Sequence, residues 1–441
     1  MVFLCYNKIA MKKINTSPIS GMQELLPDEQ AVFNNFKQTI SEVYTHHGFQ
    51  NIETPIIDRA EILLAKAGGD TEKQIYKVVK TAEAAEGADQ ALRFDHTVPL
   101  ARYVVEHESD LAFPFRVSQI GRNFRGERAQ KGRYREFYQC DIDVIGRGNL
   151  PIAYDAEVIN TYYETLKALN LPKPIIRISN RKILSGILED LELVEKSSEI
   201  FNIIDHAEKV SPEKTEEALK ELKLEEEKVD TLLAFMMIKG SSSAVKDKLF
   251  ALGVENEIFK DGVNELLYIL ELLESQGLKD ITIADMLIVR GLDYYTGTVF
   301  EAVLDDYRYI GSIGGGGRYE NLTGFFSDQP FPGVGGSIGL SRLFYVLKEN
   351  NLLKEITGKP IDIAIIPISD NEYSFSLNLA KKLRSSGQVV DVVLTDKKLG
   401  DKISYAAKIS ENAIIVGEDE VKARKMTIKN LETGETSSLS I

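Results

Sequence analysis

A cluster of basic side chains marks the segment Phe124–Gly146 of the sequence, FRGERAQKGRYREFYQCDIDVIG. Five arginines and one lysine lie between Arg122 and Arg135, although the whole chain of 441 residues has a formal net charge of -14. Local positive charge against an acidic background indicates a polyanionic ligand. Because arginine makes forked, bidentate contacts with phosphate, binding of a phosphorylated compound is the favoured chemistry. From the charges alone, a solvated basic loop is the alternative.

The local sequence also predicts the element that presents these arginines. Gly126 and Gly132 are typical of a tight loop. Polar and apolar residues alternate from Tyr134 to Val144, as in a strand. We therefore expect a β-hairpin with arginines at its base.

Other nucleotide and metal motifs are missing from the sequence. It contains no GxxxxGK[ST] loop, which argues against a P-loop enzyme. The glycine run Gly311–Gly317 is followed by Arg-Tyr-Glu-Asn rather than by the start of a helix, which argues against a nicotinamide site. We expect this run to form the wall of a small-molecule pocket. The five histidines show no metal-ligand spacing with cysteine or glutamate.

Composition places the chain among ordinary globular enzymes of two or three domains, with 43% hydrophobic and 27% charged residues. Cys5 and Cys140, the two cysteines, are far apart, which fits a reducing cytoplasm. The sequence contains no run of 18 apolar residues, so no membrane span is expected. The first ten residues are too short for a signal peptide, and the chain start is open between Met1 and Met11.

Periodicity predicts the elements of the first half of the chain. Helical spacing covers residues 27–48, after Pro27. A strand is expected over Ile52–Ile57, confined by Pro55 to a sheet edge or a bend. Leu92–Tyr103 predicts a strand, a turn and the start of a helix.

The second half combines a helical segment with a strand-rich tail. Residues 181–280 repeat leucines at helical spacing and predict an insertion of five or six helices. Strand character returns at Ile288–Leu304. A linker at 349–360 precedes alternating strands and helices and a closing hairpin, which predict a small parallel or mixed α/β domain.

Three segments resemble the class II aminoacyl-tRNA synthetases, and among these most closely the histidyl-tRNA synthetases. The arginine hairpin resembles motif 2. Val289–Glu301, VRGLDYYTGTVFE, is similar to the family's signature peptide, and Gly333–Leu347, GVGGSIGLSRLFYVL, is similar to motif 3. Gly311–Leu322 also matches the family, and the strand at Pro55 resembles motif 1. The order and spacing agree from about residue 17 to the end.

The resemblance implies an α+β fold: a class II antiparallel sheet core with a helical insertion, followed by a C-terminal α/β anticodon-binding domain. The expected domains are an N-terminal extension at 1–10, a catalytic domain at 11–350 with its insertion at about 185–280, and the anticodon-binding domain at 361–441. Family members usually continue with a helix beyond this point.

The resemblance also implies ATP-dependent activation of L-histidine to histidyl-adenylate and its transfer to the 3′ end of tRNA(His). Mg²⁺ is the expected cofactor, and the enzyme is expected to be a cytoplasmic homodimer. The main alternative is a non-catalytic, histidine-sensing regulatory paralogue of a phosphoribosyltransferase. Such paralogues typically lack the C-terminal domain and parts of the signature peptide, whereas this chain keeps both. The signature peptide disfavours another class II synthetase.

Matching the family's motifs residue by residue implies the following roles. The expected catalytic residues are Arg290 and Arg125. ATP is expected to contact Arg125, Glu127, Arg133, Phe137 and Arg342. Histidine is expected to contact Asp95, Thr97, Arg125, Gln139, Asp143, Arg290, Tyr294 and Tyr295. The metal ligands stay unassigned.

Within this set, Asp143 is expected to face one imidazole nitrogen and a tyrosine hydroxyl the other, because a neutral imidazole has one donor and one acceptor. The family often has glutamate at this position. Tyr294 and Tyr295 are expected on one strand, where only one ring can face the pocket squarely. His96 is expected to be a neighbour of the site rather than a catalyst. Without the motifs, these residues are ordinary core or salt-bridge positions.

Overall fold

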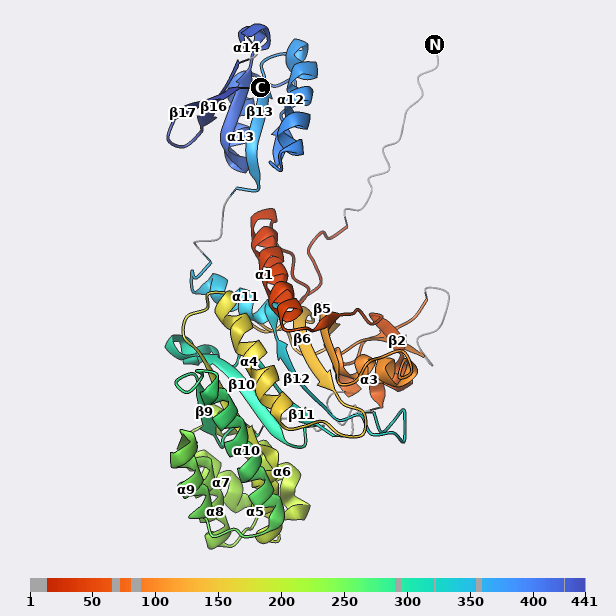
Figure 1. The fold of residues 1–441 in the computed structure, drawn as a ribbon, viewed down its shortest axis with the longest axis vertical. Helices are drawn as coiled ribbons and strands as arrows, with labels where there is room; N and C mark the ends of the chain where they lie inside the picture. Colours follow the sequence, from red (N-terminus) through yellow and green to blue (C-terminus); the bar gives the residue numbers. More distant parts are fainter. Residues whose placement is uncertain are drawn as a thin grey trace. The chain divides into compact units, whose positions relative to one another are not determined.

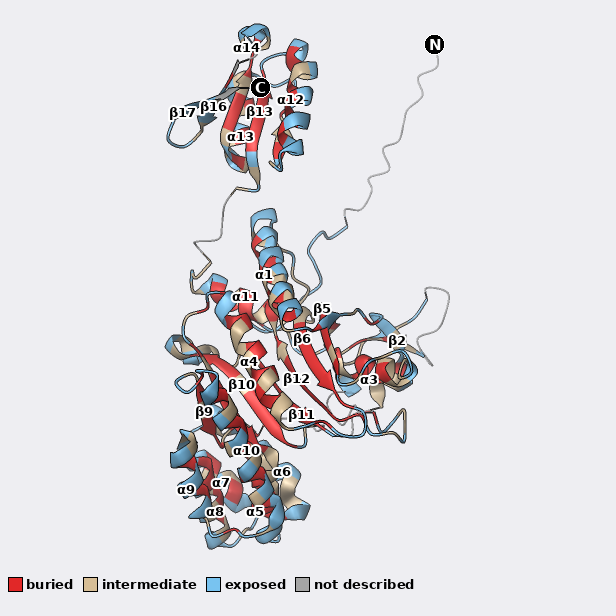
Figure 2. Cartoon of the chain, in the orientation of Figure 1, coloured by how far each residue is buried: buried red, intermediate tan, exposed pale blue. Residues whose placement is uncertain are grey.

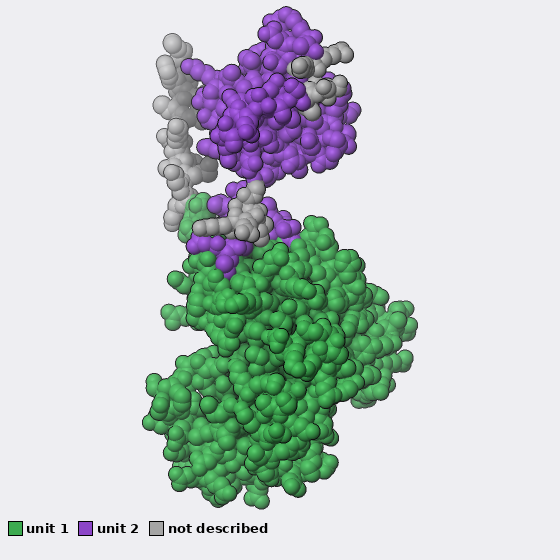
Figure 3. Space-filling view, turned by 60° about the vertical axis from the view of Figure 1, so that its left-hand side comes forward, with its two compact units in different colours: residues 1–24, 36–350 green, residues 25–35, 351–441 purple. Residues whose placement is uncertain are grey.

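The computed structural model describes residues 14–65, 72–80, 89–289, 295–320, 323–353, 359–423 and 425–440. The chain divides into two compact units, residues 1–24 with 36–350 and residues 25–35 with 351–441 (Figure 3). None of the helices in the described ranges combines the length and the apolar character that a membrane span needs. The domain limits expected from the sequence stay a prediction.

A large, mostly antiparallel sheet forms the centre of the first unit (Figure 1). Its nine strands within the described ranges run in the order β1 (Gln50–Asn51), β5 (Phe115–Phe124), β6 (Glu136–Ile145), β12 (Gly333–Ile338), β11 (Gly314–Tyr319), β10 (Thr298–Leu304), β7 (Pro174–Asn180), β9 (Thr282–Asp285) and β8 (Lys239–Gly240). Only the pairs β1–β5 and β7–β9 are parallel. The expected antiparallel core is confirmed.

Helices cover one face of this sheet, and the strands beneath them are buried (Figure 2). They are α1 (Pro27–His46), α4 (Ala153–Ala168) and α11 (Leu340–Glu349). From α1, the Tyr44 hydroxyl donates to the carbonyl of Cys140 on β6 at 3.1 Å. From β11, Arg318 forms a buried ion pair with Asp155 of α4 at 2.7 Å. These contacts fix the helices against the strands that carry the expected site residues.

The strand expected over Ile52–Ile57 is wrong in its position. The chain forms β1 before this segment and β2 (Ile57–Arg59) at its end, and the residues between belong to no strand. Pro55 lacks the N–H that a sheet ladder needs, which interrupts the strand. A separate sheet joins β2 to β4 (Gln90–Leu92) and β3 (Lys77–Val78). Helices α2 (Ala60–Leu64) and α3 (Thr97–Glu106) complete this part. The helix start expected at Thr97 is confirmed, whereas the strand β4 ends at Leu92, where the expected strand begins.

The helical character of residues 181–280, all of which are described, is confirmed. This stretch holds the six α-helices α5 (Arg181–Asp190), α6 (Ser197–His206), α7 (Pro212–Glu221), α8 (Glu226–Met236), α9 (Ser242–Phe250) and α10 (Glu257–Ser275). The return to the sheet comes earlier than expected, because β9 precedes residue 288. Glycines allow α5 and α10 to approach closely: a methyl group added at Gly186 would lie 2.5 Å from the backbone nitrogen of Phe259.

The second unit contains a five-stranded mixed sheet, which confirms the expected small α/β domain. Its strands run in the order β14 (Val390–Val392), β13 (Ile361–Pro367), β15 (Ser410–Val416), β16 (Lys425–Asn430) and β17 (Thr436–Ser440). The helices are α12 (Tyr373–Ser385), α13 (Leu399–Ile409) and α14 (Glu418–Ala423). Ile363 and Ile365 share a core with α12, while Ala364 and Ile366 share one with α13. Alternate β13 side chains therefore serve two layers.

Replacing Gly186 by alanine is expected to lower the free energy of unfolding by about 1–3 kcal/mol, because the new methyl group forces α5 and α10 apart. Gly400→Ala is the matched control in a helix, since a methyl group there meets nothing within 4 Å. Alanine is the better helix former, so the control should keep or raise the melting temperature. Thermal unfolding of both variants checks the packing, and an unchanged transition for Gly186→Ala would contradict it.

Candidate active site

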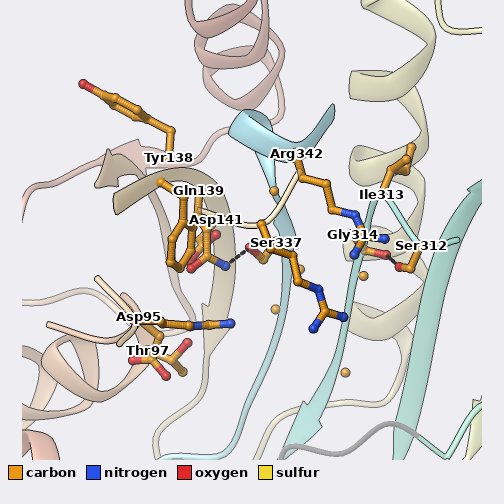
Figure 4. A pocket seen from close by; sticks show the side chains of 18 of the residues that line it. Asp95, Thr97, Tyr138, Gln139, Asp141, Ser312, Ile313, Gly314, Ser337 and Arg342 are labelled. Atoms are coloured by element: carbon orange, nitrogen blue, oxygen red, sulfur yellow. Dashed lines mark hydrogen bonds between the residues drawn. The ribbon is translucent and has the colours of Figure 1, made fainter. Parts of the chain in front are cut away.

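A cavity of about 420 Å³ opens between the β5–β6 hairpin, the turn before α3, and the strands β11 and β12 (Figure 4). Of the twelve residues that the sequence analysis assigns to the site, ten line this cavity. They are Asp95, Thr97, Arg125, Glu127, Arg133, Phe137, Gln139, Asp143, Tyr295 and Arg342. The other two, Arg290 and Tyr294, lie outside the described residues.

The expected β-hairpin is confirmed, but most of its arginines, from Arg125 to Arg135, lie beyond the strands at the tip rather than at the base. Strands β5 and β6 pair over ten residues, from Phe115 opposite Ile145 to Phe124 opposite Glu136. Beyond the strands, the tip closes where Gln130 and Arg133 exchange backbone hydrogen bonds of 3.1 and 2.9 Å. Gly132 in this tip has a φ of 71°, which glycine adopts without strain. The backbone nitrogen of Gly126 donates to the carbonyl of Gln74 at 2.7 Å, which anchors the loop.

Three arginines reach one end of the cavity from two elements. The guanidinium carbon of Arg125 lies 4.3 Å from the centre of the Phe94 ring and 5.0 Å from that of Phe137. Arg133 lies 3.7 Å from the carboxylate of Glu127. Arg342, on the first turn of α11, donates to the carbonyl of Ile310 at 2.9 Å.

The hairpin tip brings two of these arginines together. A methyl group added at Gly132 would lie 3.6 Å from the side chain of Arg342, so the turn that carries Arg133 lies against α11. Positive charge from residues more than 200 positions apart therefore faces one end of the cavity. This arrangement suits a ligand with several phosphate groups.

The opposite end of the cavity holds a buried carboxyl group and a buried phenol. The Tyr319 hydroxyl donates to Oδ1 of Asp143 at 2.9 Å. Both side chains lie across glycines of β12: a methyl group at Gly335 would overlap the Asp143 carboxylate, and one at Gly333 would overlap the Tyr319 ring. Burial, followed by repulsion from Asp141, raises the pKa of Asp143 well above its ordinary value. Burial and the neighbouring Asp143 raise the pKa of Tyr319.

Gln139 lies between the two ends, and both ends of its amide group are held. Asn123 Nδ2 donates to its Oε1 at 2.8 Å, and its Nε2 donates to the Ser337 hydroxyl at 2.6 Å (Figure 4). One amide hydrogen and one lone pair of Oε1 stay available for a ligand. Ser337 on β12 thus orients a side chain of β6.

A third wall of the cavity comes from the turn before α3. Oδ1 of Asp95 accepts a hydrogen bond of 3.0 Å from the backbone nitrogen of Val98. Thr97 is the first residue of α3. Burial raises the pKa of Asp95, and the hydrogen bond and nearby Arg125 oppose this shift. Together with Asp141 and Asp143, this residue gives the cavity a group of carboxylates suited to a cationic ligand.

Tyr295 lines the cavity but does not lie on the expected strand, which is a correction. The strand β10 begins only at Thr298. The ring of Tyr295 packs over Gly317, where a methyl group would lie 2.9 Å from its Cδ1. The ring reaches the cavity because Gly317 has no side chain and lets it approach the backbone closely, not because Tyr295 alternates with its neighbours on a strand. The glycine run of Gly311–Gly317 does form a cavity wall, as expected.

Several polar residues at the cavity were not singled out from the sequence. They are Gln74, Tyr134, Tyr138, Asp141, Ser312, Tyr319 and Ser337. Asp141 has a clear signal in the sequence, because a period of two places it on the same strand face as Gln139 and Asp143. Tyr319 follows the glycine run directly, but its approach to Asp143 depends on the pairing of β11 with β12 and of β12 with β6.

Replacing Asp143 by asparagine is expected to stabilise the protein, increasingly so as the pH rises. The folded state raises the pKa of Asp143, so the stability contributed by the neutral carboxyl is present at low pH and lost as the pH rises through the raised value. Asparagine keeps an acceptor for Tyr319 and never ionises. The gain in melting temperature should therefore be larger at about pH 8 than at about pH 4.5. Asp190→Asn, at an exposed position, is the control; equal gains at both pH values would contradict the proposed cause.

Two family models and several known proteins match the chain. The family model of histidyl-tRNA synthetase matches residues 21–343, and that of the anticodon binding domain matches residues 362–441. The histidine–tRNA ligase of Clostridium tetani is 46% identical, covering 98% of both chains. A crystal structure of histidyl-tRNA synthetase from Nostoc covers 97% of both chains with a TM-score of 0.85 and 36% identity.

A further solved structure shares the fold alone. It is described as an ATP phosphoribosyltransferase regulatory subunit/histidyl-tRNA synthetase from Bacillus halodurans, with 23% identity, a TM-score of 0.75, and coverage of 92% of this chain and 99% of its own. The family match over most of the chain and the 46% identity with a full-length relative decide the assignment. This chain belongs to the histidyl-tRNA synthetase family.

Proposed function

We propose that the cavity activates L-histidine with ATP and then passes the histidyl group to the 3′ end of tRNA(His). In the first step, a carboxylate oxygen of histidine attacks the α-phosphorus, and pyrophosphate leaves with the electron pair of the broken bond. In the second, a terminal hydroxyl of the tRNA attacks the carbonyl carbon, and AMP leaves. The observation that supports this most is that a single cavity is lined both by Arg125, Arg133 and Arg342 and by the carboxyl groups of Asp95, Asp141 and Asp143.

ATP would occupy the arginine end. Arg125 would grip the α-phosphate and the histidine carboxylate, while Arg133 and Arg342 would hold the outer phosphates. The adenine ring would stack on Phe137, and Glu127 would accept from its amino group. Because Arg125 is held between Phe94 and Phe137, its guanidinium needs little rearrangement to meet the ligand. In-line phosphoryl chemistry of this kind depends on alignment and charge neutralisation rather than on a protein nucleophile.

Mg²⁺ would accompany ATP at the same end. In nucleotide sites this ion is held mainly by phosphates and water, with one or two carboxylates from the protein. Because Glu127 is assigned to the adenine amino group, the phosphates of ATP and water would supply most of the oxygen donors, and the protein ligands of the ion stay unassigned. When bound, Mg²⁺ would neutralise phosphate charge. The alignment of the substrates would still come from the arginines.

Histidine would occupy the carboxylate end. Asp95 would bind its α-ammonium group, and Thr97 and Gln139 would contribute further hydrogen bonds. Asp143 would face one imidazole nitrogen, and a tyrosine hydroxyl from Tyr294 or Tyr295 would face the other. Tyr319 holds the Asp143 carboxyl from behind, which fixes the direction of its second oxygen. Burial of these polar groups supports selectivity, because an amino acid without matching groups would leave them unpaired.

The other parts of the chain would serve the tRNA. The α/β unit from about residue 361 would bind the anticodon, through lysines and arginines at 381–384 and 422–425. The helical insertion would clamp the acceptor stem. Arg128, Gln130 and Lys131, near the tip of the motif 2 hairpin, would touch the acceptor end. The family resemblance supports a homodimer.

The amino-acid dependence of ATP–pyrophosphate exchange tests this function. Histidine should support exchange, and other amino acids should be rejected by roughly 10⁴. Asp143→Ala should raise the histidine KM strongly and leave the ATP KM nearly unchanged, because the contacts it removes, to the imidazole and to Tyr319, all lie on the histidine side of the site. An equal loss of ATP affinity in this variant would show that Asp143 is not an imidazole ligand.

A second test concerns Arg290, which the motif places at the α-phosphorus. If it binds the charge that develops there, Arg290→Ala should lower kcat for adenylation by about 10²–10³ and change both KM values far less. Arg290→Lys should recover little, because an ammonium group cannot reproduce the guanidinium fork. A bracing role predicts instead a lower Tm and a higher histidine KM with kcat nearly preserved. Exchange kinetics and a melting curve on one sample separate these outcomes.

A further inference from the structure

A buried pair outside the expected set of ligands joins two walls of the cavity. Nδ1 of His96 lies 2.9 Å from Oδ2 of Asp141, and the two side chains are 1% and 7% exposed. For the carboxylate to accept this bond, the imidazole must be the tautomer that carries its hydrogen on Nδ1. His96 lies between Asp95 and Thr97 in the chain, and Asp141 lies between Gln139 and Asp143 on the cavity face of β6.

The same histidine is attached a second time through its backbone. Gln119 on β5, which pairs directly with Asp141, donates from Nε2 to the His96 carbonyl at 3.3 Å. Thr54 in turn donates to Oε1 of Gln119 at 3.0 Å and so fixes its amide group. Both strands of the hairpin therefore hold one residue of the turn before α3.

The space for the imidazole is created by Gly121. A methyl group at this position would lie 3.0 Å from Nε2 of His96 and 2.5 Å from the guanidinium of Arg93. Neither Nε2 of His96 nor Oδ1 of Asp141 finds a hydrogen-bond partner among the described residues. Burying polar atoms that stay unpaired costs stability, and an apolar pair would avoid that cost. A pair kept despite this cost points to a role in geometry.

We infer that His96 and Asp141 are a positioning pair, which holds the Asp95–Thr97 turn at a fixed distance from β6. This inference rests on the proposed function, in which Asp95 binds the α-ammonium of histidine and Thr97 contributes a hydrogen bond, while Gln139 and Asp143 contact the same molecule from β6. One substrate must meet ligands on two separate walls, and a displacement of about 1 Å between them can cost on the order of 100-fold in rate. His96 is not among the residues that line the cavity and would act through the turn, whereas Asp141 also contributes to the cavity wall.

The test uses exchange kinetics of the full-length chain, with histidine and ATP varied in turn. His96→Leu fills the space but removes the donor, and it should lower kcat/KM for histidine by roughly 10- to 100-fold with the ATP KM within about twofold. His96→Asn places an amide nitrogen near the position of Nδ1 and should recover most of the loss. Asp141→Leu breaks the bond from the strand side, so the test does not depend on His96→Leu folding. The double variant should be little worse than either single one.

Tyr44→Phe is the matched control, because it removes a buried hydrogen bond to the neighbouring residue Cys140 from the helix-covered face of β6. It should lower the Tm and leave the histidine kcat/KM unchanged. The inference is overturned if His96→Leu and Asp141→Leu leave kcat/KM for histidine unchanged, if they impair ATP equally, or if His96→Asn performs no better than His96→Leu. Failure of the proposed function is a different result, since the unmodified chain would then show no histidine-dependent exchange.

Discussion

The pairing of β6 with a strand on each side determines which of its side chains meet the cavity. Ten residue pairs join it to β5 and six join it to β12. A shift by one residue would turn Gln139, Asp141 and Asp143 toward the covering helices and bring apolar side chains to the cavity. The helices resist this shift, because Cys140 and Ile142 are fully buried on their side. The chemistry of the site therefore depends first on backbone register.

That register concentrates negative charge inside the fold. Three carboxyl groups, those of Asp95, Asp141 and Asp143, line one cavity, and Asp141 raises the pKa of each of the other two. The protein accepts this repulsion where a cationic substrate group is proposed to bind. Arg125, Arg133 and Arg342, which line the same cavity, are proposed to bind phosphates. Like charges gathered in each part of the cavity lower the stability of the folded protein, but they complement the opposite charges of the proposed substrates. This is expected of a site that is shaped for binding rather than for stability.

The sequence alone predicted the elements with strong periodicity and the residues that belong to motifs. The helical insertion, the hairpin and the mixed tail domain followed from spacing that depends on neighbours in the chain. Short strands such as β9 did not, because four residues give too little periodicity to separate a strand from a loop. The sequence predicts a strand that Pro55 confines to a sheet edge or a bend, whereas in the structure no strand contains Pro55. Tyr319 was not predicted as a site residue, because its contact with Asp143 reaches across β12. Such a cross-strand neighbour can be identified only once the order and register of the strands are known.

The glycines of β11 and β12 have a consequence at the level of the gene. Gly316 pairs with Gly336, and Gly317 with Gly335, so that backbone alone forms this part of the sheet. A methyl group at Gly316 would overlap the carbonyl of Gly335, and one at Gly335 would overlap Asp143. Every single-base change that alters a glycine codon introduces a side chain or a stop. At Gly335, which lines the cavity, the new side chain would displace Asp143, and at Gly316 it would press on the backbone of β12, so no single-base change that replaces either glycine leaves this part of the sheet intact.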